Sequence, residues 1–456
     1  MASHAAPLPL VVESPIDVAG RWGVRLGTCN PPAPRQLLTK AVDHYCEGLV
    51  SLQLGAGFFR PQSRPSRDLG VLLARTLAAQ GPVRVLDLMA GCGIRALRYG
   101  VEGGAGEVWA NDADPDRLPL LQANLAPLAA GKSTLRLRTT ARTAQQLLAD
   151  CLQRQERFEL VDLDAFGCPT ALLPLALEAV QFGGAIYLAS TDGRSPTGHD
   201  RPAAIRLLGA AARAHPASWE LALRLQIGVV ARAAWAMGRG VEPLLAFSEG
   251  RTFRTALRLQ RQPARAEEEQ LGLMAYCHGC GDQQVQSLIK LRQWQPCSCP
   301  VPVPLSISGP LWIGPLQKPE FLAALHKTAL HITALHKPDR ESDGQFSPAS
   351  LRLLGCLAAD PGLPARCWPS AEVARRLQTG PPPLAALVLA LQEQGYRAGV
   401  SGVMAGQLRS DAPWPVILQT ASQCHRRAPA TAKQESQSHA GLWPLKSSAS
   451  QQLFGC

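Results

Sequence analysis

Between residues 83 and 191 the pattern of apolar and polar positions switches repeatedly between a strand-like and a helix-like period. Strands that alternate with helices at this spacing predict an α/β fold with a doubly wound, mostly parallel sheet. A further helix is expected at 69–80, and residues 47–54, EGLVSLQL, alternate like a strand. The predicted strands are 83–89, 106–112, 135–140, 158–164 and 183–191, and the helices between them are 94–102, 115–126, 143–152 and 170–180.

Changes in composition divide the chain into four segments. Residues 1–45 are spotted with proline and weakly patterned, and we expect an N-terminal extension there. The α/β pattern occupies 46–264 and ends near the glutamate-rich linker ARAEEEQLG. Residues 265–422 hold paired cysteines, proline-rich strands and several helices, which predicts a smaller C-terminal α+β domain. Residues 423–456, rich in Ser, Gln and Ala, are expected to form a disordered tail.

The composition is typical of a globular protein whose cysteines remain reduced thiols. Of the 456 residues 46% are hydrophobic and 18% are charged, and no uncharged apolar stretch of about 18 residues could cross a membrane. The N-terminus lacks the basic start and apolar run of a signal peptide. Thirteen cysteines at irregular spacings do not suggest a disulfide framework. These features predict a cytoplasmic protein with no membrane partner, and they imply no obligate protein partner.

Positive charge gathers in one region of the chain. The net charge is +11, and the segment from Arg201 to Arg265 holds eleven arginines, three glutamates and no lysine. Such a region suits contact with a nucleic acid. Because arginine is the preferred cation along the whole chain, a mildly basic surface explains the pattern equally well.

A glycine turn, DLMAGCGIR, begins at Asp87 between a predicted strand and a predicted helix. Gly91 and Gly93 let the backbone approach a ligand without a Cβ, and the helix amides favour polar or anionic groups. Asp87 is placed to organise the turn and to accept hydrogen bonds from an amino-acid moiety. Asp112 ends the next strand, 25 residues later, where a carboxylate can bind both ribose hydroxyls. This arrangement serves NAD and S-adenosylmethionine alike.

The strand at 158–164 distinguishes the two cofactors, because it leads into Asp164-Ala165-Phe166-Gly167. An amino-methyltransferase mainly has to aim an amine at an already activated methyl group. A carboxylate at this place accepts hydrogen bonds from an exocyclic NH2 and can take up its proton, while an aromatic ring stacks on the base. The alternative is that Asp164 caps the next helix and Phe166 belongs to the core.

Several motifs follow one another along residues 47 to 413. They are GFFRPQSRPSRDL, GCGIRALRYG, VWANDADP, DLDAFGCP, LASTDGRS, the stretch from ELALRL to FRTALRL, a C-x-x-C, GPLWIGPL, and a late GYRAG followed by DAP. In this order they resemble the tRNA guanine-26 N2-dimethyltransferase family. The chain is identified as a divergent, bacterial-type member of that family, because so many ordered matches are hard to obtain by coincidence.

The resemblance implies a class I methyltransferase fold over 46–264, S-adenosylmethionine as cofactor and tRNA as partner. The C-terminal domain and the basic region would hold the tRNA, with the target guanine flipped from its stack. Asp164 would be the catalytic carboxylate, with Phe166 against the guanine. The residues implied to line the cofactor pocket are Arg67, Arg95, Asp112 and Ala144, with Thr143 at the position where the family has an acid for the adenine amino group.

The chain departs from the family pattern at a few positions. Ala165 replaces a proline, and proline would hold φ near −65° in this loop. Phe59 and Arg60 replace a tyrosine and an asparagine, and Gly402 and Val403 replace a histidine and phenylalanine pair. We expect these differences to affect specificity or rate.

Four cysteines form a compact pattern after the linker. Cys277 and Cys280 form a C-x-x-C, and Cys297 and Cys299 form a C-x-C after sixteen intervening residues. Four thiolates beside glycines suit a structural zinc ribbon. The second pair is one residue tighter than usual, so unligated cytosolic thiols are the alternative.

These observations predict an enzyme that transfers one or two methyl groups from S-adenosylmethionine to the N2 amine of guanine in tRNA, at position 26 by the resemblance. One alternative is a catalytically weakened protein that binds or chaperones tRNA, and another is an amine methyltransferase acting on a different RNA base. The glycine turn together with Asp112, Asp164 and Phe166 favours the enzyme, because a protein that only binds RNA has little use for a cofactor turn.

Overall fold

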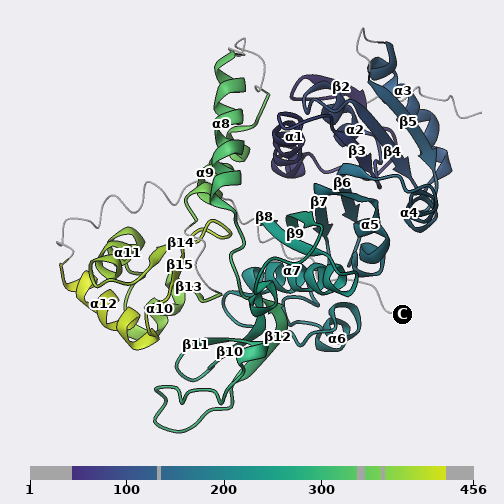
Figure 1. The fold of residues 1–456 in the computed structure, drawn as a ribbon. Coiled ribbons are helices and arrows are strands. Elements are labelled where there is room, and N and C mark those ends of the chain that lie inside the picture. Colours follow the sequence, from purple (N-terminus) through teal and green to yellow (C-terminus); the bar gives the residue numbers. More distant parts are fainter. Residues whose placement is uncertain (1–43, 131–134, 336–344, 361–364, 428–456) are drawn as a thin grey trace, which may run out of the picture. The chain divides into compact units, whose positions relative to one another are not determined.

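A seven-stranded sheet with the order β5-β4-β3-β6-β7-β9-β8 is the largest element of the computed structural model, which describes residues 44–130, 135–335, 345–360 and 365–427 (Figure 1). Strands β3 to β7 run parallel, and β9 pairs antiparallel with both β7 and β8. The predicted doubly wound, mostly parallel sheet is therefore confirmed. The strands are β3 (Arg84–Asp87), β4 (Glu107–Asp112), β5 (Arg136–Ala141), β6 (Phe158–Ala165), β7 (Val180–Ser190), β8 (Gly240–Glu249) and β9 (Thr252–Gln260).

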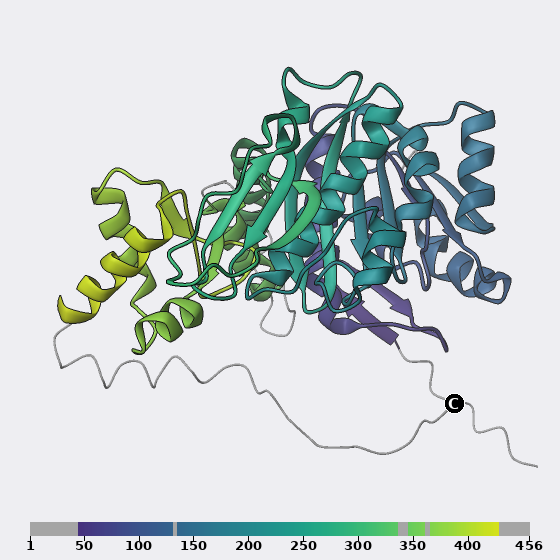
Figure 2. The same ribbon diagram turned by 90° about the horizontal axis from the view of Figure 1, so that it is seen from below.

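Helices cover both faces of this sheet (Figure 2). Side chains of α1 (Arg64–Ala78), α2 (Ile94–Val101) and α3 (Leu118–Ala130) share one apolar cluster with the sheet. Those of α4 (Ala144–Gln153), α5 (Leu173–Ala179) and α7 (Ser218–Ala236) share another. A short helix, α6 (Arg201–Leu208), lies between β7 and α7 in the chain.

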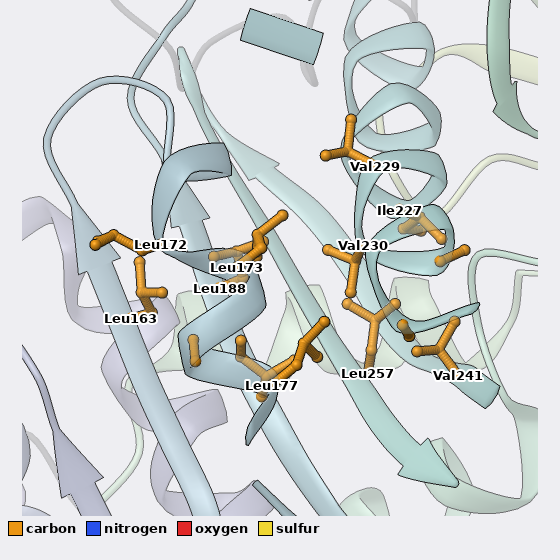
Figure 3. Close-up of a cluster of buried hydrophobic side chains, with 14 of the residues drawn as sticks. Leu163, Leu172, Leu173, Leu177, Leu188, Ile227, Val229, Val230, Val241 and Leu257 are labelled. Atoms are coloured by element: carbon orange, nitrogen blue, oxygen red, sulfur yellow. The ribbon is translucent and has the colours of Figure 1, made fainter. Parts of the chain in front are cut away.

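Successive strand residues point to opposite faces, and both faces are buried. In β3, Val85 belongs to the cluster with α1 and α2, whereas its neighbour Leu86 belongs to the cluster with α5 and α7. Figure 3 shows this second cluster, in which Leu177 of α5 and Val230 of α7 pack over Leu257 of β9. Burial on both sides explains why these strands are almost continuously apolar in sequence.

The strand predicted at 47–54 is confirmed only over 50–53, because its first residues belong to a hairpin turn and to the end of another strand. Strand β1 (His44–Glu47) pairs antiparallel with β2 (Val50–Gln53) through a turn at Gly48. Gly48 has a φ of +60°, and an added Cβ would lie 2.5 Å from a carboxylate oxygen of Glu102. The alternating pattern is real, but only the positive φ of one glycine, invisible in the pattern, reverses the chain.

Within the described residues after β9, the chain forms two small sheets and five α-helices, so a C-terminal α+β part is present. The first sheet holds β10 (Leu271–Tyr276), β11 (Gln283–Ser287) and β12 (Ser306–Trp312); the second holds β13 (Cys367–Pro369), β14 (Ala398–Val400) and β15 (Gln407–Ser410). The helices are α8 (Pro319–Leu335), α9 (Pro348–Ala358), α10 (Ser370–Leu377), α11 (Leu384–Glu393) and α12 (Trp414–Arg427).

The predicted terminal segments fall mostly outside the described residues. Of the extension expected at 1–45 only 44 and 45 are described, and they lie in β1. Of the tail expected at 423–456 only 423–427 are described, and α12 includes them. Within the described part of the chain, no helix is long and apolar enough to cross a membrane.

A buried arginine ties the hairpin to the first two helices. Arg98 of α2 is fully buried, and its guanidinium contacts Glu102 at 2.8 Å, Glu47 of β1 at 2.8 Å and Asp68 of α1 at 2.5 Å. All three carboxylates are themselves fully buried. Burial works against the charge, but the carboxylates prevail and raise the pKa of Arg98. One cation therefore pairs with three buried acids, of which Glu47 also pairs with Arg67.

Replacing Arg98 with methionine keeps an unbranched apolar stem and removes the charged guanidinium. Because buried carboxylates are left uncompensated, we expect R98M to lower the free energy of unfolding by about 3–5 kcal/mol. Chemical denaturation measures this loss. The control is R154M, since Arg154 pairs with Asp150 while 58% exposed, and its loss is expected to change stability by less than about 1 kcal/mol. Equal effects of the two variants would contradict the assigned role of Arg98.

Candidate active site

A cavity of about 700 Å³ opens where the carboxyl ends of β3, β4 and β6 meet. Its walls come from the loop before α1, the glycine turn after β3, the loop after β4, the end of β6 and the start of β9. Ligands of open α/β sheets bind outside the carboxyl ends of the strands. The cavity therefore lies where the fold places a ligand.

The glycine turn forms one wall. Gly91 has a φ of +56°, and a Cβ added to it would meet no atom within 4 Å, so the cavity extends over the turn. Gly93 has a φ of +86°, and a Cβ there would lie 2.7 Å from Leu121. The first glycine leaves space for a ligand, whereas the second has a left-handed φ that favours glycine and lies close to Leu121 of α3.

Asp112 is held at the mouth of this turn. Its Oδ2 accepts a hydrogen bond from the Gly91 amide at 2.9 Å, and its Oδ1 accepts one from the Asp114 amide at 3.0 Å. Each carboxylate oxygen still has capacity for a second donor. Asp112 lines the cavity, so its oriented carboxylate fits a pair of ribose hydroxyls. The open turn, the carboxylate and the volume together fit S-adenosylmethionine.

Asp87 lies beneath the turn rather than on the cavity wall. Its side chain is fully buried, and neither carboxylate oxygen has a hydrogen-bond partner among the described residues. Burial, reinforced by the nearby Asp162, raises the pKa of Asp87 well above its usual value. The prediction that Asp87 accepts hydrogen bonds from a ligand therefore stays a prediction.

Thr143 and Ala144 begin α4 and are not part of the cavity wall. The Thr143 hydroxyl accepts a hydrogen bond from the Gln146 amide at 3.3 Å, and the Gln146 side chain accepts one from the Thr143 amide at 3.2 Å. This reciprocal pair is a capping box. The threonine hydroxyl thus caps the helix in this structure.

Arg67 lines the cavity and orients the loop that precedes α1. Its Nε donates to Glu47 at 2.8 Å, and its other nitrogens donate to the carbonyl oxygens of Arg60 and Pro61. The guanidinium also lies 5.0 Å from the ring centre of Phe59. The loop is therefore held from inside by one arginine.

Asp164 is at the end of β6 with its side chain 28% exposed toward the cavity. Its Oδ2 contacts two buried cations, Arg254 Nη2 at 2.7 Å and Arg95 Nη2 at 3.2 Å. Burial alone would raise the pKa of Asp164, but Arg254 and then Arg95 outweigh it and lower the value to about 2. Asp164 is consequently a carboxylate at neutral pH.

Arg95 also contacts the layer below the cavity. It donates to the Ser66 hydroxyl at 3.0 Å and to Asp162 at 3.5 Å. The Tyr99 hydroxyl donates to the same Asp162 oxygen at 2.5 Å. The cavity floor is therefore a buried layer of charges, with Asp164 as its member nearest the opening.

Two aromatic rings stand at the cavity opening. Phe166 is 78% exposed and Phe58 is 66% exposed, and their ring centres are 5.5 Å apart in an edge-to-face arrangement. Two large apolar side chains this exposed beside a cavity indicate a binding surface. Phe166 is not a core residue, so that alternative is wrong. Phe58 and Arg254 were not expected, although a GFF triplet in a proline-rich loop is a signal for an exposed ring.

The eleven arginines of the basic region 201–265 differ in their surroundings. Four of its eleven arginines form ion pairs, namely Arg224 with Glu220, Arg239 with Glu178, Arg254 with Asp164 and Arg258 with Glu242. Five others are exposed and make no ion pair with a described residue; they are Arg201, Arg206, Arg251, Arg261 and Arg265. Those five are available to an anionic partner.

The four predicted cysteines come together at one end of the β10–β12 sheet. Their sulfur atoms all lie within 4.8 Å of one another, with Cys277 Sγ 3.5 Å from Cys297 Sγ and 3.6 Å from Cys299 Sγ. Tetrahedral zinc with bonds of about 2.3 Å separates its sulfur ligands by about 3.8 Å. A Cβ on Gly279 would lie 2.6 Å from Cys299 Sγ, so glycine lets the C-x-C pair approach. The donor set fits zinc.

The fold and cavity have the form of a class I S-adenosylmethionine-dependent methyltransferase. A model of the N2,N2-dimethylguanosine tRNA methyltransferase family matches residues 47–422, and the chain belongs to this family. Relatives named tRNA (guanine(26)-N(2))-dimethyltransferase include one from Thermococcus kodakarensis, 28% identical over 79% of this chain and 92% of its own length. Another, from Methanoregula boonei, is 28% identical over 81% of this chain and 94% of its own length.

Among solved structures, Trm1 from Pyrococcus horikoshii in complex with S-adenosyl-L-methionine has a TM-score of 0.71 and 24% identity, covering 83% of this chain and 99% of that one. This likeness confirms the fold. The predicted family is confirmed by the family match. The bacterial type stays a prediction, as do the roles of the individual site residues.

Zinc binding is tested by replacing one cysteine at a time. We expect C297S to remove about one equivalent of zinc per chain and to lower the melting temperature, because the metal links β10 to the loop before β12. Elemental analysis and thermal unfolding measure both effects. The matched control is C356S, since Cys356 is exposed and lies outside the cluster. Wild-type protein purified without zinc, and equally stable with and without added zinc, would contradict the site.

Proposed function

We propose that this protein uses S-adenosylmethionine to methylate the exocyclic N2 amine of guanine 26 in tRNA. The observation that carries the proposal is the position of Asp164 and Phe166 at the opening of the cavity that also holds the glycine turn and Asp112. The names of the relatives support the choice of base and position. Transfer of two methyl groups in succession is part of the proposal.

The cofactor supplies an activated methyl group, and the protein has to hold and orient it. We assign Asp112 to the ribose hydroxyls and the backbone at Gly91 to the approach of the amino-acid part. Arg67 and Arg95 also line the cavity and set its charge. Asp87 supports the turn from beneath, and the start of α4 at Thr143 and Ala144 is assigned to the adenine side.

The target base is assigned to the space between the two exposed rings and Asp164. Phe58 and Phe166 provide faces on which a flipped guanine stacks. Asp164 accepts a hydrogen bond from the N2 amine and aims its lone pair at the methyl carbon. The new N–C bond forms as the S–C bond breaks, the bonding pair stays on sulfur, and the amine loses a proton to water.

The residue after Asp164 is alanine where the family has proline, and the sheet compensates for the difference. Ala165 still belongs to β6, where its Cα is paired with Ser190 of β7, and it is 6% exposed. The Gly167 amide then donates to the Thr191 hydroxyl at 2.6 Å. Strand pairing therefore restrains the backbone that proline would otherwise restrain, which supports an active enzyme over a weakened one.

tRNA binding is assigned to two parts of the chain. The five exposed arginines between 201 and 265 can neutralise backbone phosphates. We also propose the division expected from sequence, with 46–264 as the methyltransferase domain and 265–422 as the tRNA-binding domain. Binding through phosphates implies that affinity falls steeply as the salt concentration rises.

Asp164→Asn tests the assigned role of the carboxylate. We expect D164N to lower methyl transfer by about 100-fold or more, with tRNA affinity nearly unchanged, because the negative charge that orients the substrate amine is lost. Mass-spectrometric nucleoside analysis of tRNA before and after reaction measures mono- and dimethylguanosine, and fragment mapping gives the position. The control is D150N, because Asp150 lies on α4 and forms ion pairs with the exposed residues Arg142 and Arg154. Turnover equal in D164N and wild type would remove Asp164 from the mechanism.

The pKa of Asp164 predicts how its ionisation depends on pH. Its folded value of about 2 lies below the usual 3.8, so the stability that its ion pairs contribute is present above about pH 4 and is lost as the pH falls toward 2. We therefore expect the 13C resonance of this carboxyl group, assigned by its loss in D164N, to be constant above about pH 5. A titration midpoint above pH 5 would contradict the ion-paired state.

A further inference from the structure

We propose that Arg254 is a positioning residue for methyl transfer, which holds one oxygen of Asp164 so that the other receives the substrate amine. This inference rests on the proposed function and adds a residue to its mechanism. Arg254 lies 90 residues after Asp164 in the chain, on a different strand, and its guanidinium is 2% exposed.

The sheet register brings these two residues together. Asp164 of β6 is paired with Ala189 of β7, and Ala189 is paired with Arg254 of β9. Residues in one such row have side chains on the same face of the sheet. Because Ala189 is small, the long side chain of Arg254 reaches across it to Asp164. The ring of Tyr187, one pleat away on the same face, lies 5.4 Å from the Arg254 guanidinium and 6.0 Å from that of Arg95.

The two cations meet the carboxylate on one side only. The shortest contacts of both Arg254 and Arg95 are with Oδ2, and among the described residues no hydrogen bond is made to Oδ1. Asp164 also lines the cavity. A hydrogen bond from Arg254 and an ion pair with Arg95 at the same oxygen restrain the rotation of the carboxylate, so its other oxygen keeps one direction. That direction is what an amine needs in order to present its lone pair to the methyl carbon.

Ion-pair stability alone does not explain Arg254. Its Nε and Nη1 are buried and have no hydrogen-bond partner among the described residues. Burying a cation with unpaired donors costs free energy, and a buried ion pair is weak evidence for stability. Arg258, four residues further on the same strand, instead pairs with Glu242 while 20% exposed. Strand β9 thus carries Arg258, whose ion pair is an ordinary partly exposed one, and Arg254, whose position is explained by the site.

Several charged or titratable groups surround Asp164, so its protonation depends on all of them. Arg254 and Arg95 lower its pKa against the effect of burial, and Arg67 contributes in the same direction. Loss of Arg254 leaves fewer cations to balance the neighbouring acids, and the pKa of Asp164 then rises. The neighbours that face this layer are Arg67, Asp87, Arg95, Tyr99, Asp162, Tyr187, Glu249 and Arg254.

The test compares R254Q, R254K and the control R258Q in full-length protein, with unmodified tRNA and S-adenosylmethionine. We expect R254Q to lower kcat about 100-fold while the Kd for S-adenosylmethionine changes less than about threefold. R254K keeps a charge near Oδ2 and should recover about tenfold of that loss. R258Q should stay within about twofold of wild type. In R254Q, kcat should also acquire an acid limb that is absent from wild type.

A double variant separates positioning from general damage. If Arg254 acts through Asp164, D164N/R254Q should be no slower than D164N alone, because effects of residues in one unit are not additive. A rate for the double variant equal to the product of both single losses would overturn the inference, as would full activity of R254Q. If R254Q fails to fold, the kcat of R254K and its pH profile test the inference instead. A kcat and a pH profile equal to those of wild type would overturn the inference. Wild-type protein that forms no methylguanosine would instead refute the proposed function.

Discussion

The pairing of one oxygen of Asp164 with two buried guanidinium groups is the interaction around which the cavity is organised. An isolated carboxylate on the floor of an apolar cavity would take up a proton, since burial alone raises its pKa. Arg254 and Arg95 prevent this and keep the charge in place. They approach from β9 and α2, so the strand order, the helix after the glycine turn and the site chemistry depend on one another.

A second buried charge centre supports the first from the side of the hairpin. Arg98 gathers Glu47, Asp68 and Glu102, and Glu47 in turn holds Arg67, which fixes the loop that carries Phe58. Arginine suits both centres because its planar fork bonds several acceptors at once and stays charged when buried. The loop that carries the exposed ring of Phe58 is therefore held by buried ion pairs.

Departures from the family pattern have local compensations. Ala165 lacks the restraint of proline but is paired along β6 with β7. Thr143 stands where an acid is expected, and its hydroxyl caps α4. Each substitution thus fits its own place in the fold without disturbing Asp112 or Asp164. Local hydrogen bonding explains how the chain can diverge while the arrangement at the cavity is preserved.

The apolar periodicity and short local motifs were sufficient to predict the alternating strands and helices and the glycine turn. The same holds for Asp112, Asp164 and the cysteine pattern, because each of these signals lies within a few neighbouring residues. The strand predicted at 47–54 is confirmed only over 50–53, because the turn at Gly48, which has a positive φ, leaves no mark on the apolar pattern. Tertiary structure alone decided that Asp87 lies beneath the turn, that Phe166 is exposed, and that Arg254 reaches Asp164 across Ala189. Those facts depend on which strands become neighbours and in what register. Contacts between residues 90 positions apart arise only when the strands assemble into the sheet.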